Sequence, residues 1–136
     1  MITCGIDLKG SSACFVFLQK SKDGIVENIT GNFTKLNIED NENCKQIKSF
    51  FDTAKAHFDL VNPDRIGIVK RNTKGKFSGG AVSFKLEGLI QLYDKKNIVL
   101  VSPITLRAFQ KKHDCGLPQN KYQEKAHLLA MFLLEK

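Results

Sequence analysis

The sequence predicts an α/β fold: a five-stranded mixed sheet with helices on both faces, in which three antiparallel strands are followed by alternating helices and strands. Three observations predict it. Residues 2–38 hold three strand-like stretches separated by glycine-containing turns, helix-type spacing of apolar residues begins at Asn41, and short apolar runs occupy residues 65–70 and 97–101. The chain has 136 residues, the length of one domain, so we expect a single domain over residues 1–136.

The first three strands are expected to form an antiparallel meander over residues 2–8, 12–20 and 25–38. Gly10 breaks the chain between the first two strands, and the Asp23-Gly24 pair is a strong hairpin signal between the second and third. The third stretch has a break of its own near Gly31-Asn32.

A crossover helix and a buried strand follow. Apolar residues recur at spacings of three, four and seven, which predicts one buried helical stripe formed by Ile47, Phe50, Phe51, Ala54, Phe58 and Val61. Pro63 ends this helix, and residues 65–70 (RIGIVK) are typical of a strand buried on both faces.

The second half predicts three more helices and one more strand. After a polar, glycine-rich loop at residues 71–80, a second helix is expected to bury Val82, Leu86, Leu89, Ile90 and Tyr93. The run 97–101 (NIVLV) predicts the fifth strand, and Ser102-Pro103 predicts the start of a third helix. Asn120 with Gln123 indicates a capping box before a last helix whose inward residues would be Tyr122, Ala126, Leu129, Ala130 and Leu133.

The composition predicts a cytoplasmic protein that is neither secreted nor inserted in a membrane. No apolar run approaches the roughly 20 residues of a membrane helix, and no secretion signal is recognisable. The four cysteines have no metal-binding spacing, so we expect reduced thiols, with Cys4 and Cys14 packed in the sheet. The net charge of +7 would attract a polyanion if the cations share a face, although a solvated basic surface is the plain alternative.

Asp7 is the most informative single residue. It closes an apolar strand-like run and precedes a glycine turn, where a metal or phosphate can approach closely. Together with the order of elements, the segment Gly5-Ile6-Asp7-Leu8-Lys9-Gly10-Ser11 is similar to the Gly-Ile-Asp-Pro-Gly opening of RuvC-like resolvases. The chain therefore resembles the ribonuclease H-like superfold and, within it, this resolvase group. The stretch from Lys70-Arg71 to Glu87-Gly88 also resembles a small bacterial and phage family of the same superfold.

The resemblance implies a nuclease site with two divalent ions, Mg²⁺ or Mn²⁺, held by carboxylates of the first strand, the fourth strand and the last helix. Asp7 takes the first of these positions. Glu124 and His127, three residues apart on one helical face, would take the last, so Asp7 and Glu124 are the expected metal ligands.

The fourth strand departs from the family pattern, because Lys70 stands near the position where a glutamate is expected. Glu87, on the helix after the loop, would supply the missing ligand if that helix turned its face toward the sheet end. The expected catalytic set is then Asp7, Glu87, Glu124 and His127.

Each of these residues also has an ordinary structural explanation. Asp7 can bond to the amides of Gly10 and Ser11, Glu124 with His127 can be a surface pair, and Glu87 can be a solvated helix residue.

The basic loop after the fourth strand is a candidate nucleic-acid contact. It carries Lys70, Arg71, Lys74, Lys76 and Phe77, in which the cations would neutralise phosphates and the ring would stack on an unpaired base. The alternative is a solvated loop in which Phe77 is a hydrophobic anchor. Further positive charge near the last helix, at Lys111, Lys112, His113, Lys121 and Lys125, would extend a backbone track if it shares an edge with the loop.

Two functions of different classes follow. The first is a metal-dependent nuclease or junction resolvase that binds nucleic acid. The second is a catalytically silent module of the same fold that binds nucleic acid or a protein partner, for example a phage-type inhibitor. A nucleotide-binding fragment of the actin and sugar-kinase type is a third, but the chain is short for two domains closing over ATP. An exposed apolar face on the second helix would support a homodimer, although burial of that face against the sheet explains the same residues. The sequence distinguishes neither DNA from RNA nor one substrate structure from another.

Overall fold

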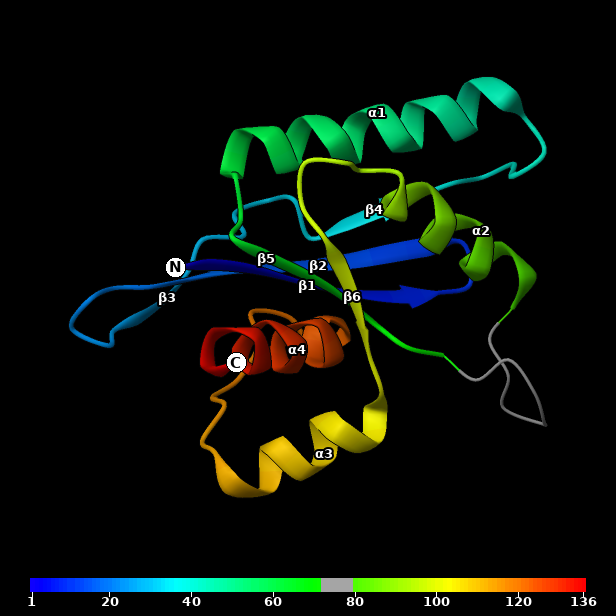
Figure 1. Ribbon diagram of the computed structural model, residues 1–136. Coiled ribbons are helices and arrows are strands. Elements are labelled where there is room, and N and C mark those ends of the chain that lie inside the picture. Colours follow the sequence, from blue (N-terminus) through cyan, green and yellow to red (C-terminus); the bar gives the residue numbers. More distant parts are fainter. Residues whose placement is uncertain (72–79) are drawn as a thin grey trace.

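The computed structural model describes residues 1–71 and 80–136 and shows one mixed sheet in the order β3-β2-β1-β5-β6 (Figure 1). β4 lies beside β2, off this path, so the described residues form six strands. The bounds are β1 (Ile2–Lys9), β2 (Ser12–Lys20), β3 (Val26–Asn28), β4 (Lys35–Asn37), β5 (Arg65–Val69) and β6 (Ile98–Val101). β1 pairs antiparallel with β2 and parallel with β5, and β5 pairs parallel with β6. The predicted α/β fold class is confirmed.

The expected third strand is divided into β3 and β4, which both pair antiparallel with β2. Between them Thr30 is buried, and its Oγ1 accepts a hydrogen bond from the Phe17 amide at 2.9 Å. The Thr30 hydroxyl therefore takes the place of a backbone carbonyl as the acceptor for this amide of β2. Gly31 then turns the chain with a φ of +60°. The break falls where the sequence predicted it, and it makes two short strands of one.

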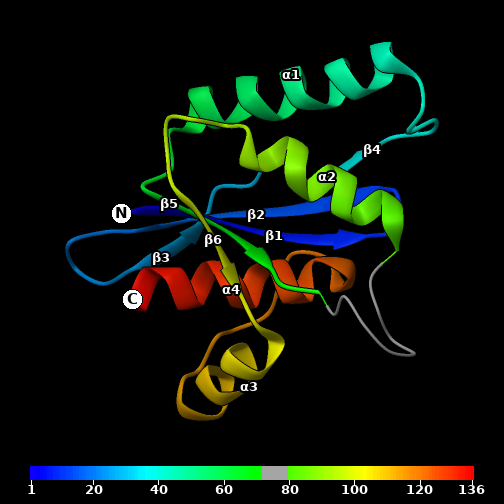
Figure 2. The same cartoon turned by 45° about the vertical axis from the view of Figure 1, so that its right-hand side comes forward.

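The helices cover both faces of the sheet (Figures 1 and 2). α1 and α2 lie on one face, and α3 and α4 lie on the other. Their bounds are α1 (Cys44–Val61), α2 (Ala81–Gln91), α3 (Pro103–Lys112) and α4 (Glu124–Glu135), with a 3₁₀ turn, η1 (Lys121–Gln123), leading into α4. No helix in the two described ranges has the length and apolarity needed to cross a membrane.

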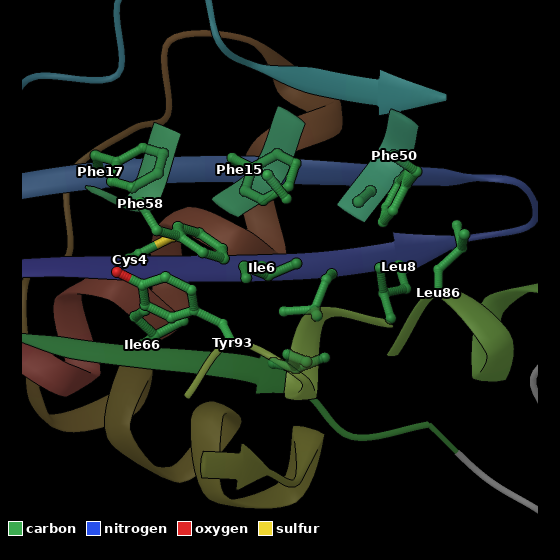
Figure 3. Close-up of a cluster of buried hydrophobic side chains, with 14 of the residues drawn as sticks. Cys4, Ile6, Leu8, Phe15, Phe17, Phe50, Phe58, Ile66, Leu86 and Tyr93 are labelled. Carbon is green, nitrogen blue, oxygen red and sulfur yellow. The ribbon is translucent and has the colours of Figure 1, made fainter. Parts of the chain in front are cut away.

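The core under α1 and α2 is aromatic (Figure 3). Phe58 of α1 meets Phe15 and Phe17 of β2, with ring centroids 6.2 and 6.4 Å apart, and Tyr93 closes the other side of Phe58 at 5.0 Å. Cys4 also points into this layer, and both Cys4 and Cys14 are buried as predicted. These rings come from β2, from α1 and from the turn after α2, and they cover this face of β1.

On the other face α4 lies unusually close to β1. A methyl group added to Gly5 would lie 2.0 Å from the carbonyl oxygen of Ala126, and Thr3 Oγ1 donates a hydrogen bond of 2.9 Å to the Ala130 carbonyl. The absence of a side chain at Gly5 thus allows backbone contact between strand and helix. This contact fixes the position of α4 relative to the strand that carries Asp7.

The predicted helix starts are confirmed. Ser102 Oγ accepts from the Thr105 amide at the head of α3, and Asn120 and Gln123 form the capping box, which precedes η1. Gln123 is fully buried and its side-chain amide donates to the Phe15 carbonyl at 2.8 Å. The prediction that Tyr122 points inward is wrong: it is 38% exposed because the 3₁₀ turn rotates it off the buried face, where its hydroxyl donates to Thr34.

Candidate functional site

A cleft opens at the edge of the sheet where the parallel strands β1, β5 and β6 end. Ligands of open α/β sheets commonly bind beyond the carboxyl ends of such strands. The cleft has a volume of about 590 Å³, and α3 and α4 supply its other walls. The described residues that line it are Asp7, Leu8, Lys9, Val69, Lys70, Arg71, Ser102, Pro103, Ile104, Arg107 and Lys125.

Asp7 is the one carboxylate among these described lining residues. It is only 3% exposed, and its Oδ2 atom accepts no hydrogen bond, so neither the Gly10 nor the Ser11 amide is bonded to that oxygen. Burial raises the pKa of Asp7, while the positive charges of Lys9, Lys125 and Arg71 act in the opposite direction. A partly desolvated acid thus lies within a positively charged neighbourhood.

Lys9 and Arg71 are held in place beside this acid. The Lys9 ammonium lies 3.6 Å from Asp7 Oδ2 and also donates to the Tyr122 carbonyl at 3.4 Å, so it joins β1 to the start of the α4 segment. The Arg71 guanidinium pairs with Glu87 at 3.1 Å and lies over the Phe84 ring, 4.4 Å from its centroid. The Arg71 side chain is 11% exposed, and both of these contacts, Glu87 and Phe84, are residues of α2.

The remaining cations reach the cleft from three further positions. Lys70 follows β5 and is exposed, with its backbone amide bonded to the Val101 carbonyl at 2.8 Å. Arg107 is exposed on the second turn of α3, and Lys125 is exposed on the first turn of α4. Five cationic side chains from four segments therefore line the described part of the cleft with a single acid.

The structure separates the residues predicted to form one site. Asp7, Lys70 and Arg71 share the cleft, but Glu87 lies behind it as the partner of Arg71. Glu124 and His127 line a different hollow of about 370 Å³ between α3 and α4. The predicted contacts Lys74, Lys76 and Phe77 lie outside the described residues.

His127 is engaged in the second hollow. Its Nε2 donates a 2.7 Å hydrogen bond to the Cys115 carbonyl, and its Nδ1 is buried with no hydrogen-bond partner. The side chain is buried, and its bond to the Cys115 carbonyl ties α4 to the loop that follows α3. Glu124 and His127 share a helical face, as their spacing predicts, and the adjacent Lys125 lies on the face directed at Asp7.

Two cleft residues, Lys9 and Arg107, were not predicted as site residues. Lys9 stands two positions after Asp7, so both side chains project from the same face of β1, which the sequence could have indicated. Arg107 had no such signal, because only the packing of α3 under β6 brings it to the sheet edge.

The family described as "Protein of unknown function (DUF3010)" matches residues 1–133. The chain belongs to this family. No curated protein matches the sequence.

Several solved structures share the fold of this DUF3010 protein. Thermus thermophilus RuvC has a TM-score of 0.76 at 8% identity, over 96% of this chain and 92% of that one. T. thermophilus RuvC in complex with a Holliday junction substrate has a TM-score of 0.70 at 9% sequence identity, over 96% of this chain and 91% of that one. The fowlpox virus resolvase in complex with Holliday junction DNA has a TM-score of 0.50 at 13% sequence identity, over 98% of this chain and 93% of that one. The predicted ribonuclease H-like fold is thereby confirmed.

The described residues of the DUF3010 protein do not fit the pair of divalent ions that the resemblance implies. Mg²⁺ and Mn²⁺ are held by several oxygen ligands with net negative charge. No group of three or more His, Cys, Asp or Glu side chains in the described ranges could hold a metal ion. At Asp7 the neighbours are the cations of Lys9, Arg71 and Lys125 instead of further carboxylates. The described lining is thus positively charged, with a single acid.

Proposed function

We propose that this protein binds nucleic acid and that the cleft at Asp7 holds the sugar-phosphate backbone. The convergence of five cations on one cleft is the observation that carries the proposal. They come from the end of β1, the residues after β5, the second turn of α3 and the first turn of α4. A solvated basic surface would not require such distant segments to place their charges around one hollow.

The position of the cleft supports the same function. It lies at the carboxyl ends of β1, β5 and β6, and the first turn of α3 lines it with Pro103 and Ile104. The amino end of a helix carries partial positive charge, which adds to the field of the side chains. Two of the solved structures with this fold are bound to Holliday junction DNA, so a four-way junction is the first ligand to test.

The test measures fluorescence anisotropy of labelled four-way junction, duplex and single-stranded oligonucleotides over a range of salt concentrations. Binding should weaken steeply with salt, because each phosphate contact releases counterions. Lys125→Ala and Arg107→Ala should each weaken binding and reduce the salt slope by about one unit. Lys48→Ala is the matched control, since Lys48 is an exposed lysine of α1 on the opposite face of the sheet.

Equal affinities in the Lys125, Arg107 and Lys48 variants would contradict the cleft as the binding surface. If no oligonucleotide binds even at low salt, the proposed function is wrong and the cleft serves another anion.

Metal-dependent cleavage of nucleic acid is the second candidate. The observation in its favour is the buried carboxylate of Asp7 on the first strand of a ribonuclease H-like fold. Incubation of each labelled oligonucleotide with Mg²⁺ or Mn²⁺ tests it directly. Cleavage by the natural protein that is absent in Asp7→Asn would establish it.

A further inference from the structure

We infer that the protein's own cations, chiefly those of Lys9, Arg71 and Lys125, do the work at Asp7 that a divalent ion would otherwise do, so that the cleft binds phosphate groups without a metal. This inference rests on the proposed function and specifies how the same cleft recognises its ligand. The ligand class is a phosphodiester backbone.

The first step is the charge of the cleft. Its described lining holds five cationic side chains and one carboxylate, and Glu87 behind the cleft pairs with Arg71, so five minus two leaves a formal balance of +3. A divalent cation entering this hollow would meet like charge on several sides, whereas a phosphate anion would be attracted from each of them. The cleft is therefore already electropositive without a metal.

The second step is the position of the cations nearest the acid. Lys9 lies 3.6 Å from Asp7 Oδ2, on the same face of β1, and a second bond to the Tyr122 carbonyl restrains it. The positive charges of Lys125 and Arg71 act on the same carboxylate. Asp7 thus has one ammonium group in ion-pair distance and two further cations that act on its charge, where a metal site would place a divalent ion.

The third step is the role of Asp7. A buried acid that accepts no hydrogen bond at Oδ2 is not a structural acceptor at that oxygen. The nearest cations have contacts of their own, since Lys9 donates to the Tyr122 carbonyl and Arg71 pairs with Glu87. Asp7 is therefore not needed to hold them in the cleft, and its negative charge repels phosphate and limits the affinity.

The Asp7→Asn variant distinguishes this arrangement from a metal site by the sign of its effect. Removal of the one carboxylate in the described lining should tighten binding of duplex or junction DNA by roughly threefold to tenfold, in EDTA and in Mg²⁺ alike, because the repulsion of phosphate is lost. Substitution of a metal ligand would instead weaken binding in Mg²⁺. Weaker binding of Asp7→Asn in EDTA would also overturn the inference.

Two further measurements complete the test. The dissociation constant of the natural protein for DNA should be the same in EDTA and in Mg²⁺ at equal ionic strength, and a calorimetric titration of Mn²⁺ alone should show no binding. A requirement for Mg²⁺, or Mn²⁺ uptake that is lost in Asp7→Asn, overturns the inference even if DNA binds. Failure to bind any nucleic acid overturns the proposed function instead, and the Mn²⁺ titration still decides whether Asp7 is a metal ligand.

Discussion

At the scale of single residues, the environment of Asp7 decides the chemistry of the cleft. A carboxylate at the end of a buried strand is compatible with a metal site, with a turn cap or with an anion-binding cleft. The neighbours in space distinguish these cases: Lys9 lies within 3.6 Å, the charges of Lys125 and Arg71 act on the same carboxylate, and Glu124 lines a different hollow. The same residue type would serve a different function with different neighbours.

Asp7 should destabilise the folded protein at neutral pH. Burial raises its pKa, so the unfolded chain releases this proton at a lower pH than the folded one. The free energy of unfolding therefore falls as the pH rises above about 4, the ordinary range of an aspartate, and stays lowered at pH 7. Asn at this position cannot ionise.

We therefore expect Asp7→Asn to have a higher Tm than the natural protein at pH 7 and nearly the same Tm below about pH 4. Thermal melts between these values measure the difference. The control is Asp94→Asn, because Asp94 is exposed and its substitution should cause no comparable pH-dependent gap. A lower Tm for Asp7→Asn at pH 7 would mean that its ion pairs outweigh the cost of its burial.

At the scale of secondary-structure elements, the contact between α4 and β1 sets the geometry of the cleft. Lys125 and Asp7 are 118 positions apart, and they share the cleft because α4 lies directly against β1 at Gly5. The bonds from Thr3 to the Ala130 carbonyl and from Gln123 to the Phe15 carbonyl fix the helix along the strands. A shift of α4 would move Lys125 away from the acid.

Gly5→Ala should destabilise the protein by about 3 kcal/mol or more, because the new methyl group would overlap the backbone of α4. Its Cβ would lie 2.0 Å from the Ala126 oxygen and 2.7 Å from the Ala130 nitrogen, and neither backbone atom can rotate away. Urea unfolding measures the change. Gly88→Ala is the control: this glycine lies within α2 with open space around it, so alanine there should stabilise by up to about 1 kcal/mol.

A loss of less than about 1 kcal/mol in Gly5→Ala would show that α4 can move away from β1 without cost. In that case the position of Lys125 in the cleft would be set by other contacts.

At the scale of the whole molecule, part of the net charge of +7 is concentrated at one edge of the sheet. The aromatic core packs against α1 and α2. Five cationic side chains line the cleft at the carboxyl ends of β1, β5 and β6. Hydrophobic layers on both faces of the sheet hold the described part of the fold together.

Two effects on thermal stability follow for the intact protein. EDTA should leave the Tm unchanged, whereas duplex or junction DNA at a hundred times its dissociation constant should stabilise the fold by about 2.7 kcal/mol through mass action. Differential scanning fluorimetry with and without each addition measures both. A fall in Tm with EDTA would reveal a bound metal that the cleft's lining does not suggest.

The sequence determined the order of the elements, the helix start at Ser102, the capping box at Asn120 and the buried faces of the helices apart from Tyr122, because these follow from local periodicity and capping. It also marked Asp7 as the central residue and the break in the third strand. Only the tertiary structure decided which charges surround that acid. Lys9, Arg107 and Lys125 meet there because α3 and α4 pack beneath the sheet, and the close approach at Gly5 turns Lys125, and not Glu124, toward the cleft. Packing between distant segments leaves no periodic pattern in a sequence, and so the chemistry of the cleft could be read only from the folded chain.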